Sequence, residues 1–238
     1  MDQGVNPKRK VTIPLDHPVW VLRELVKRND QIKRLFFLDY HYSQNEEARD
    51  YDGDRDYISV APNGICRELL SHHKRILGTE RDLAVISRVQ MHDDKVMHIP
   101  MIDFKGVVSF HEMGLVKRLL VKYGINDCAI YWSGHSFHFY GLSLIEGFIG
   151  FMDDVRMLGY QSIDPPYDEG YEDFCDNLAR SIHGSLSFVT DYRWASHSVM
   201  QGYGSLRLTC NQDRYAKIPR LVYRGDLSGF VQKNVMWP

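Results

Sequence analysis

The sequence predicts an α+β fold: an RNA-recognition-like (ferredoxin-like) antiparallel sheet core with helices packed on it. The first observation is a hairpin signal, because residues 82–104 are two β-branched, apolar runs separated by the polar turn 92–95. The second is a pair of stretches with helical spacing that enclose two more strand-like runs, namely 109–123, 127–132, 137–145 and 146–158. The resulting order, β-β-α-β-β-α, places helices on one face of a mostly antiparallel sheet.

Shorter signals flank this unit. Val19 to Arg28 has helical spacing, and Asn63 can cap a helix that ends near Gly78. After residue 158 we expect, in order, an acidic loop over 161–176, a strand over 186–190, a short helix to Met200, a strand over 206–209 and a basic loop over 211–220. We therefore divide the chain into an N-terminal helical and irregular region, residues 1–80, packed on a core formed by residues 81–238.

Charge is unevenly distributed along the chain. The 238 residues include 29 Lys and Arg against 31 Asp and Glu, a net charge of −2 that is ordinary for a globular protein and excludes a disordered or fibrous chain. Residues 153–176 hold eight acids and one base, a net −7, whereas residues 177–238 hold eight bases and three acids, a net +5. A nucleic-acid ligand is therefore compatible with the nearly neutral total.

The chain has the composition of a cytoplasmic protein. No apolar run approaches the roughly 20 residues that span a bilayer, and the first ten residues lack the apolar segment of a signal peptide. The four cysteines lie far apart without a CxxC pair, which argues against a zinc site built on cysteines. We expect a reducing compartment and no membrane partner.

Two acidic residues end apolar strands. Asp103 closes the run in MIDFK, and Asp191 closes the run in FVTDYRW. A carboxylate in this position can bind a metal ion at the edge of a sheet, or it can cap the following turn. The segments alone leave both interpretations open.

Several polar residues also lie around a glycine turn, in the segment SGHSFH. The turn at Ser133 and Gly134 would let a hydroxyl and backbone N–H groups approach a phosphate. His138 follows in a strand and shares its face with Ser136 and Tyr140 at period two. A histidine among aromatic residues can equally be a core residue.

Arg207 lies inside a short strand, where a guanidinium needs an acceptor. A phosphate would serve, and so would a salt bridge to Asp191 or Glu146.

Taken together, MIDFK, SGHSFH and FVTDYRW resemble the motifs of the archaeo-eukaryotic primase (primase-polymerase) superfamily, in the same order. The segment from Arg193 to Pro219 resembles the later part of primase-like domains of bacterial genomes. The resemblance covers roughly residues 82–220. It implies a primase-like catalytic domain that joins nucleotides on nucleic acid.

The resemblance also implies roles for individual residues. Asp103 and Asp191 would hold Mg²⁺ or Mn²⁺ and, with His138, would be catalytic; the nucleotide would contact Ser133, Ser136, His138, Arg207 and Lys217. Carboxylates that hold a divalent ion and cations that face a triphosphate are what phosphoryl transfer requires. The implied partners are a nucleoside triphosphate, a single-stranded or template nucleic acid, and a helicase or another replication or defence protein.

One residue departs from the family pattern and keeps two alternatives open. Lys105 stands where the family has its second acid, and it removes a metal ligand. The first alternative is therefore a catalytically degenerate primase-like module that binds nucleotides or nucleic acid inside a larger machine. The second is a phosphoesterase that uses His138 and His197 as an acid–base pair.

Overall fold

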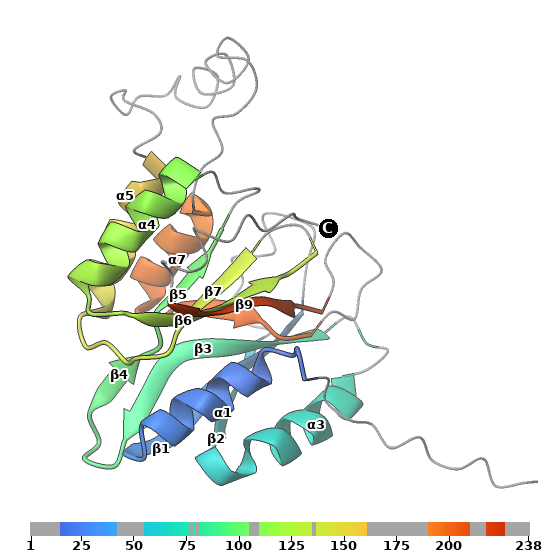
Figure 1. Ribbon diagram of the computed structural model, residues 1–238. Helices are drawn as coiled ribbons and strands as arrows, with labels where there is room; N and C mark the ends of the chain where they lie inside the picture. The colour runs from blue at the N-terminus through green and yellow to red at the C-terminus, as the bar shows by residue number, and fades with distance from the viewer. Residues whose placement is uncertain are drawn as a thin grey trace, which may run out of the picture.

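The protein is built from two antiparallel sheets and five α-helices among the described residues (Figure 1). This computed structural model describes residues 15–41, 55–76, 79, 81–104, 110–134, 137–160, 190–209 and 218–226. Sheet A has the strand order β2-β1-β3-β4, with β8 also paired to β3, and sheet B has the order β5-β7-β6-β9. The predicted α+β class and antiparallel pairing are confirmed, although the strands are divided between two sheets.

Sheet A is organised around β3 (Arg81–Met91), which pairs with β1 (Ile32–His41), β4 (Val96–His98) and β8 (Ser205–Arg207). β2 (Arg55–Val60) extends the sheet beyond β1. The expectation of only helical and irregular structure before residue 81 was wrong for β1 and β2. The run IKRLFFLDYH has no clean alternation, because its pairing with β3 is interrupted by two register shifts. The domain division at residue 80 stays a prediction.

The predicted hairpin over 82–104 is divided by a proline. β3 and β4 form its two strands, but the chain then leaves sheet A at Ile99 and Pro100, and β5 (Met101–Asp103) joins sheet B. Proline has no N–H to donate to a sheet ladder. Its carbonyl accepts a hydrogen bond from the Gly141 N–H at 2.8 Å, which starts the pairing with sheet B.

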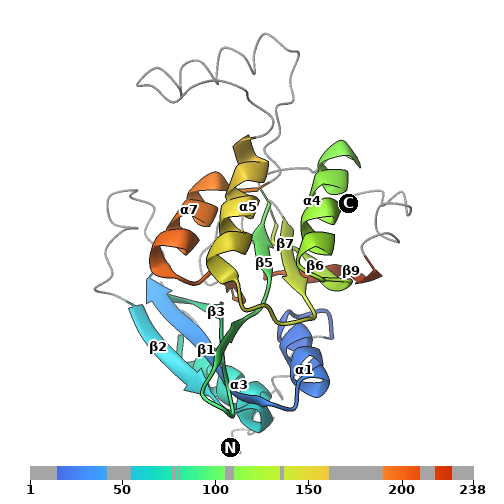
Figure 2. The same ribbon diagram turned by 90° about the vertical axis from the view of Figure 1, so that its left-hand side faces the viewer.

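Sheet B carries three helices on one face: α4 (Phe110–Lys122), α5 (Phe148–Tyr160) and α7 (Tyr192–Gln201) (Figure 2). Their apolar sides form one core with alternate residues of the strands, among them Ile102, Ile130 and Phe139. The remaining strands are β6 (Asp127–Trp132), β7 (Phe137–Gly141) and β9 (Arg220–Asp226). The sequence did not predict β9, because charged residues interrupt its apolar residues and leave no long apolar run.

A second core lies between the two sheets. It combines the inner face of sheet A with α1 (Val19–Arg28), the single turn η2 (Pro62–Gly64), α3 (Ile65–Ile76) and the other face of sheet B. The sheet B residues that enter it are Met101, Ala129, Tyr131 and Tyr140, with Leu221 of β9 packed against them. Each strand of sheet B therefore contributes to one core on each face.

Several expected features lie outside the described residues. They are the acidic loop over 161–176, most of the strand over 186–190, most of the basic loop over 211–220, and residues Lys105, Ser136 and Lys217. No described helix is long and apolar enough to cross a membrane.

A buried carboxylate joins sheet A to α3. Asp39 is 1% exposed, and its oxygens accept hydrogen bonds from His72 at 2.8 Å, Arg75 at 3.3 Å and Arg81 at 2.6 Å. Burial acts to raise the pKa of this carboxyl, but the hydrogen bonds from Arg81 and His72 outweigh it, and the pKa is lowered. The charged form is therefore part of the folded structure.

We expect Asp39→Asn to lower the free energy of unfolding by about 2–4 kcal/mol at pH 7, since it leaves Arg81 and His72 without their buried, charged acceptor. Because the folded pKa lies below the unfolded one, the contribution is present above about pH 4 and is lost as the pH falls through the folded pKa. Urea unfolding at pH 7 and at pH 3 measures both effects. Asp56→Asn is the matched control, because Asp56 also contacts Arg81 but its side chain is 73% exposed. A loss in the control as large as in Asp39→Asn would contradict this account.

Candidate active site between the sheets

The site begins with a cross-strand pair. In the β5–β7 ladder Asp103 lies directly opposite His138, and the His138 Nε2 is 3.8 Å from an Asp103 carboxylate oxygen. His138 is buried, whereas the Asp103 side chain remains 25% exposed. The pair therefore presents a carboxylate toward solvent with an imidazole behind it.

Asp191 approaches the same pair through its backbone. Its N–H donates to the Asp103 carbonyl at 2.8 Å, just before α7 begins. Its carboxylate caps α7, with one oxygen accepting from the Trp194 N–H at 3.0 Å. The capping interpretation is thus confirmed for Asp191, whose backbone also lies beside Asp103. Metal binding by Asp191 stays a prediction.

Arg207 connects β8 to the end of β6. Its guanidinium donates to the carbonyl of Ser133 at 3.1 Å and to that of Thr209 at 2.8 Å. The sequence suggested Asp191 or Glu146 as a structural partner; backbone carbonyls accept these two bonds, and Glu146 pairs with Lys95. Both of these acceptors are uncharged.

That charge acts on His138. Burial first, and then the positive charge of Arg207, lower the pKa of His138 from 6.5 to about 3. His138 is therefore neutral at physiological pH and can donate one N–H, but it contributes no positive charge to the site. A bound anion would raise this pKa again.

Two polar atoms in this core have no hydrogen-bond partner among the described residues. Within the described part of the chain, His138 Nδ1 and the Tyr140 hydroxyl are buried without a hydrogen bond. They are two residues apart on one face of β7, and the charges of Asp103 and Arg207 both act on Tyr140. Buried polar groups without partners are uncommon and are often satisfied by a ligand or an ordered water.

The acidic residues have the right chemistry for Mg²⁺ or Mn²⁺ but form a sparse set. Asp103 and the second oxygen of Asp191 are hard donors of the kind these ions prefer. No group of three or more His, Cys, Asp or Glu suited to holding a metal occurs among the described residues. Two protein carboxylates suffice where a bound triphosphate supplies the remaining oxygens, as is common for Mg²⁺.

The structure unites part of the predicted site. Asp103, Asp191, His138, Ser133 and Arg207 lie on neighbouring segments, linked by the contacts described above. Ser133 is 4% exposed, and its carbonyl is bonded to Arg207. The placement of Ser136 and Lys217 lies outside the described residues.

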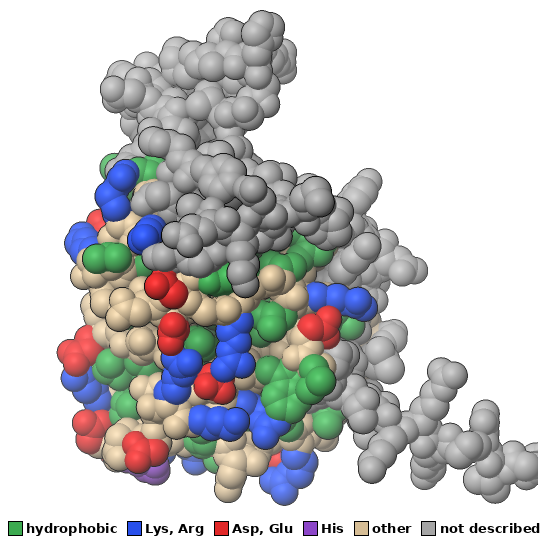
Figure 3. Space-filling model, viewed as in Figure 1, with side chains coloured by type: hydrophobic (Ala, Val, Ile, Leu, Met, Phe, Trp, Pro, Cys, Tyr) green, Lys and Arg blue, Asp and Glu red, His purple; other side chains and the backbone are tan. Residues whose placement is uncertain are grey.

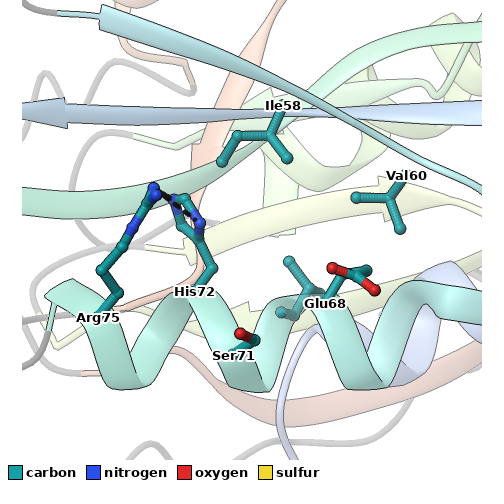
Figure 4. Close-up of a pocket in the computed structure, with 7 residues that line it drawn as sticks. Ile58, Val60, Glu68, Ser71, His72 and Arg75 are labelled. Carbon is teal, nitrogen blue, oxygen red and sulfur yellow. Dashed lines mark hydrogen bonds between the residues drawn. The ribbon is translucent and has the colours of Figure 1, made fainter.

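A polar pocket lies elsewhere, between β2 and α3. Its volume is about 230 Å³, and Ile58, Val60, Glu68, His72 and Arg75 are among the residues that line it (Figure 4). Our sequence reading passed over His72 and Arg75. Their i, i+3 spacing on a helix is a visible signal, but their shared partner Asp39 is more than thirty residues away in sequence.

Two antiparallel sheets, with three helices on one face of sheet B, are the architecture of a primase-like α+β domain. A model of the family described as archaeo-eukaryotic primase 1D-like matches residues 63–220, about two thirds of the chain. The chain belongs to this family. No curated protein and no solved structure matches it significantly. The match begins before the residue 82 that the motifs suggested and includes α3, which contacts Asp39.

The electrostatic coupling between Arg207 and His138 can be measured. We expect Arg207→Gln to raise the pKa of His138 above 3, yet to leave it below 6.5, because burial is the larger cause. NMR titration of the imidazole resonances of the wild-type protein and the variant measures the pKa of His138.

His98 is the internal control for this titration. Its pKa, lowered to about 4 by burial and by Arg88, should not move when Arg207 is changed. An unchanged His138, or an equal shift in both histidines, would contradict the coupling.

Proposed function

We propose that this protein is a primase-polymerase-like nucleotidyltransferase that acts on nucleoside triphosphates and a nucleic-acid strand with Mg²⁺ or Mn²⁺. The observation that carries the proposal is the β5–β7 register, which sets Asp103 opposite His138 while Asp191 is hydrogen-bonded to Asp103. Family membership supports the same reaction class. These residues meet only in the folded chain, and they match the motifs of the family.

Each residue has a distinct task in this proposal. Asp103 and Asp191 hold the divalent ion, whose chemistry is to offset charge on the triphosphate and to orient it. Neutral His138 donates an N–H to a phosphate oxygen, and Arg207 supplies the fixed positive charge. Ser133, Ser136 and Lys217 complete the proposed nucleotide contacts.

A degenerate, non-catalytic module is the second candidate. Lys105 in place of the second motif acid favours it. So does the lack, among the described residues, of a cluster of three or more potential metal ligands. Such a module would bind nucleotide or nucleic acid without turnover, within a complex that contains a helicase or another replication or defence protein. We place either form in the cytoplasm, which suits the free thiols of Cys66 and Cys128.

The histidine phosphoesterase loses support. A general acid–base histidine works best with a pKa near the operating pH, whereas that of His138 is about 3.

Nucleotide incorporation on a primed template tests the catalytic proposal. We expect Asp103→Asn and Asp191→Asn each to reduce the incorporation rate by on the order of 100-fold or more, because each removes a metal-binding charge. Asparagine is also a good helix cap, so Asp191→Asn removes the charge while α7 keeps its N-terminal cap.

Asp94→Asn is the matched control for this assay. Asp94 lies in the β3–β4 turn with φ 64°, which asparagine tolerates, and its side chain is 69% exposed. Full activity in both site variants would refute the catalytic assignment. Binding of triphosphate by a wild-type protein that shows no incorporation would select the degenerate module.

A further inference from the structure

Sheet A has an outer face of which the proposed nucleotide site uses only Arg207. Across β2, β1, β3 and β8 the register places Tyr57, Leu38, Ala84 and Arg207 in one row. The neighbouring rows on this face bring Phe36 and Tyr40 from β1 and Arg55 from β2. Because side chains alternate along a strand, all of these point away from the core shared by the two sheets.

No described helix takes part in the apolar cluster of this face. The cluster consists of Leu38, Ala84, Ile86 and Tyr203, with Phe36 and Tyr40 packed against it. The helices α1 and α3 belong to the core on the opposite side of sheet A, to the right of β1 and β2 in Figure 2. The outer face thus carries an aromatic layer that is not under a described helix.

The aromatic layer is partly open to solvent and held rigid. Tyr57 is 57% exposed, and its hydroxyl is 2.7 Å from that of Tyr203, whose ring meets it edge-on. Phe36 and Tyr40 are half-buried. A ring fixed by a hydrogen bond beside a buried partner offers a flat surface at low cost in side-chain entropy.

Arginines surround the aromatic layer. Arg34 and Arg88 are exposed; Arg34 donates to Ser59 at 2.9 Å, and the Arg88 guanidinium lies 5.8 Å from the Tyr203 ring centroid. Arg55 and Arg207 add two more positive charges. The acid that the described strands place on this face, Asp82, is 3% exposed and accepts a hydrogen bond from Thr209. Arg34 and Arg88 therefore supply exposed positive charge to the described part of this face.

On the opposite side of the molecule, around α1, basic side chains are paired with acidic ones. Lys and Arg side chains over α1 in Figure 3 are interspersed with acidic ones. Arg28 pairs there with Glu24 and Asp127, and Arg224 also pairs with Glu24. Paired charges offer little to a phosphate backbone.

Aromatic rings interleaved with arginines, on a sheet face that no described helix covers, fit one class of ligand. Unpaired bases stack on aromatic side chains, and arginines neutralise the phosphates between them. A duplex hides its base faces and could use only the arginines. Arg207 lies on this face and also contacts Ser133 of the nucleotide site, so a strand bound here can continue into that site.

We propose that the outer face of sheet A, formed by Tyr57, Phe36, Tyr40, Arg34 and Arg88, binds single-stranded nucleic acid and leads it toward Arg207. The binding itself is independent of catalysis; only its use as a template path depends on the function proposed above. The surface does not require Mg²⁺, Mn²⁺ or a triphosphate.

Fluorescence anisotropy with labelled oligo(dT) and oligo(rU), at low salt and without metal, measures the binding in an Asp103→Asn background. We expect Tyr57→Ala to weaken binding about tenfold, since stacking of one base is lost. Tyr57→Phe keeps the ring but loses the bond to Tyr203, and it should bind within about twofold of the parent. Arg34→Gln with Arg88→Gln should reduce the slope of log affinity against log salt by about 1.4.

The matched control is Arg67→Gln, because Arg67 is 83% exposed on α3, on the other side of sheet A. Equal losses in this control, unchanged affinity in the Tyr57 and arginine variants, or a preference for duplex would each overturn the proposal. Tight single-strand binding that depends on Tyr57 in a protein without incorporation would support the surface while contradicting the catalytic function. If Tyr57→Ala changes neither nucleotide incorporation nor single-strand affinity, the result would support the catalytic function and contradict the proposed binding surface.

Discussion

The short ladder between β5 and β7 is the constraint on which the rest of the site depends. Three residue pairs form it, from Met101 opposite Tyr140 to Asp103 opposite His138. The chain reaches this ladder by leaving sheet A at Pro100, which cannot donate a hydrogen bond to either sheet. A register shift of one residue would turn Asp103 away from His138 and into the apolar core beneath the helices. Bonds from Phe104 to Phe137 and from Asp191 to Asp103 extend the pairing at the same end.

Two buried ionisable groups, Asp39 and His138, differ in their charge state. Asp39 remains charged because three basic side chains donate to it, and its pKa is lowered. His138 remains neutral because burial and Arg207 both disfavour its protonated form. Both carboxylate oxygens of Asp39 are hydrogen-bonded to protein side chains, so we interpret this group as structural. His138 has a ring nitrogen without a partner in the described residues, which is what a binding site requires.

The sequence predicted the elements well where periodicity was clean. Val19–Arg28 and Asp127–Trp132 match the predicted ranges, and the helices α4 and α5 begin within two residues of them. It failed for β1, β2 and β9, whose charged residues obscure the alternation. These strands are stabilised by pairing, of β1 with β3, of β2 with β1 and of β9 with β6, and pairing between distant segments is not contained in the local pattern.

By itself, the sequence determined the family motifs, their order along the chain, and the position of Asp103 and Asp191 directly after apolar runs. Only the tertiary structure decided that Asp103 lies opposite His138, that Arg207 bonds backbone carbonyls, and that Tyr57 and Arg207 lie in one row of sheet A. The physical reason is that strand register and sheet membership depend on pairing between residues far apart in the chain. The pKa of His138 likewise depends on burial and on a charge nearly seventy residues away.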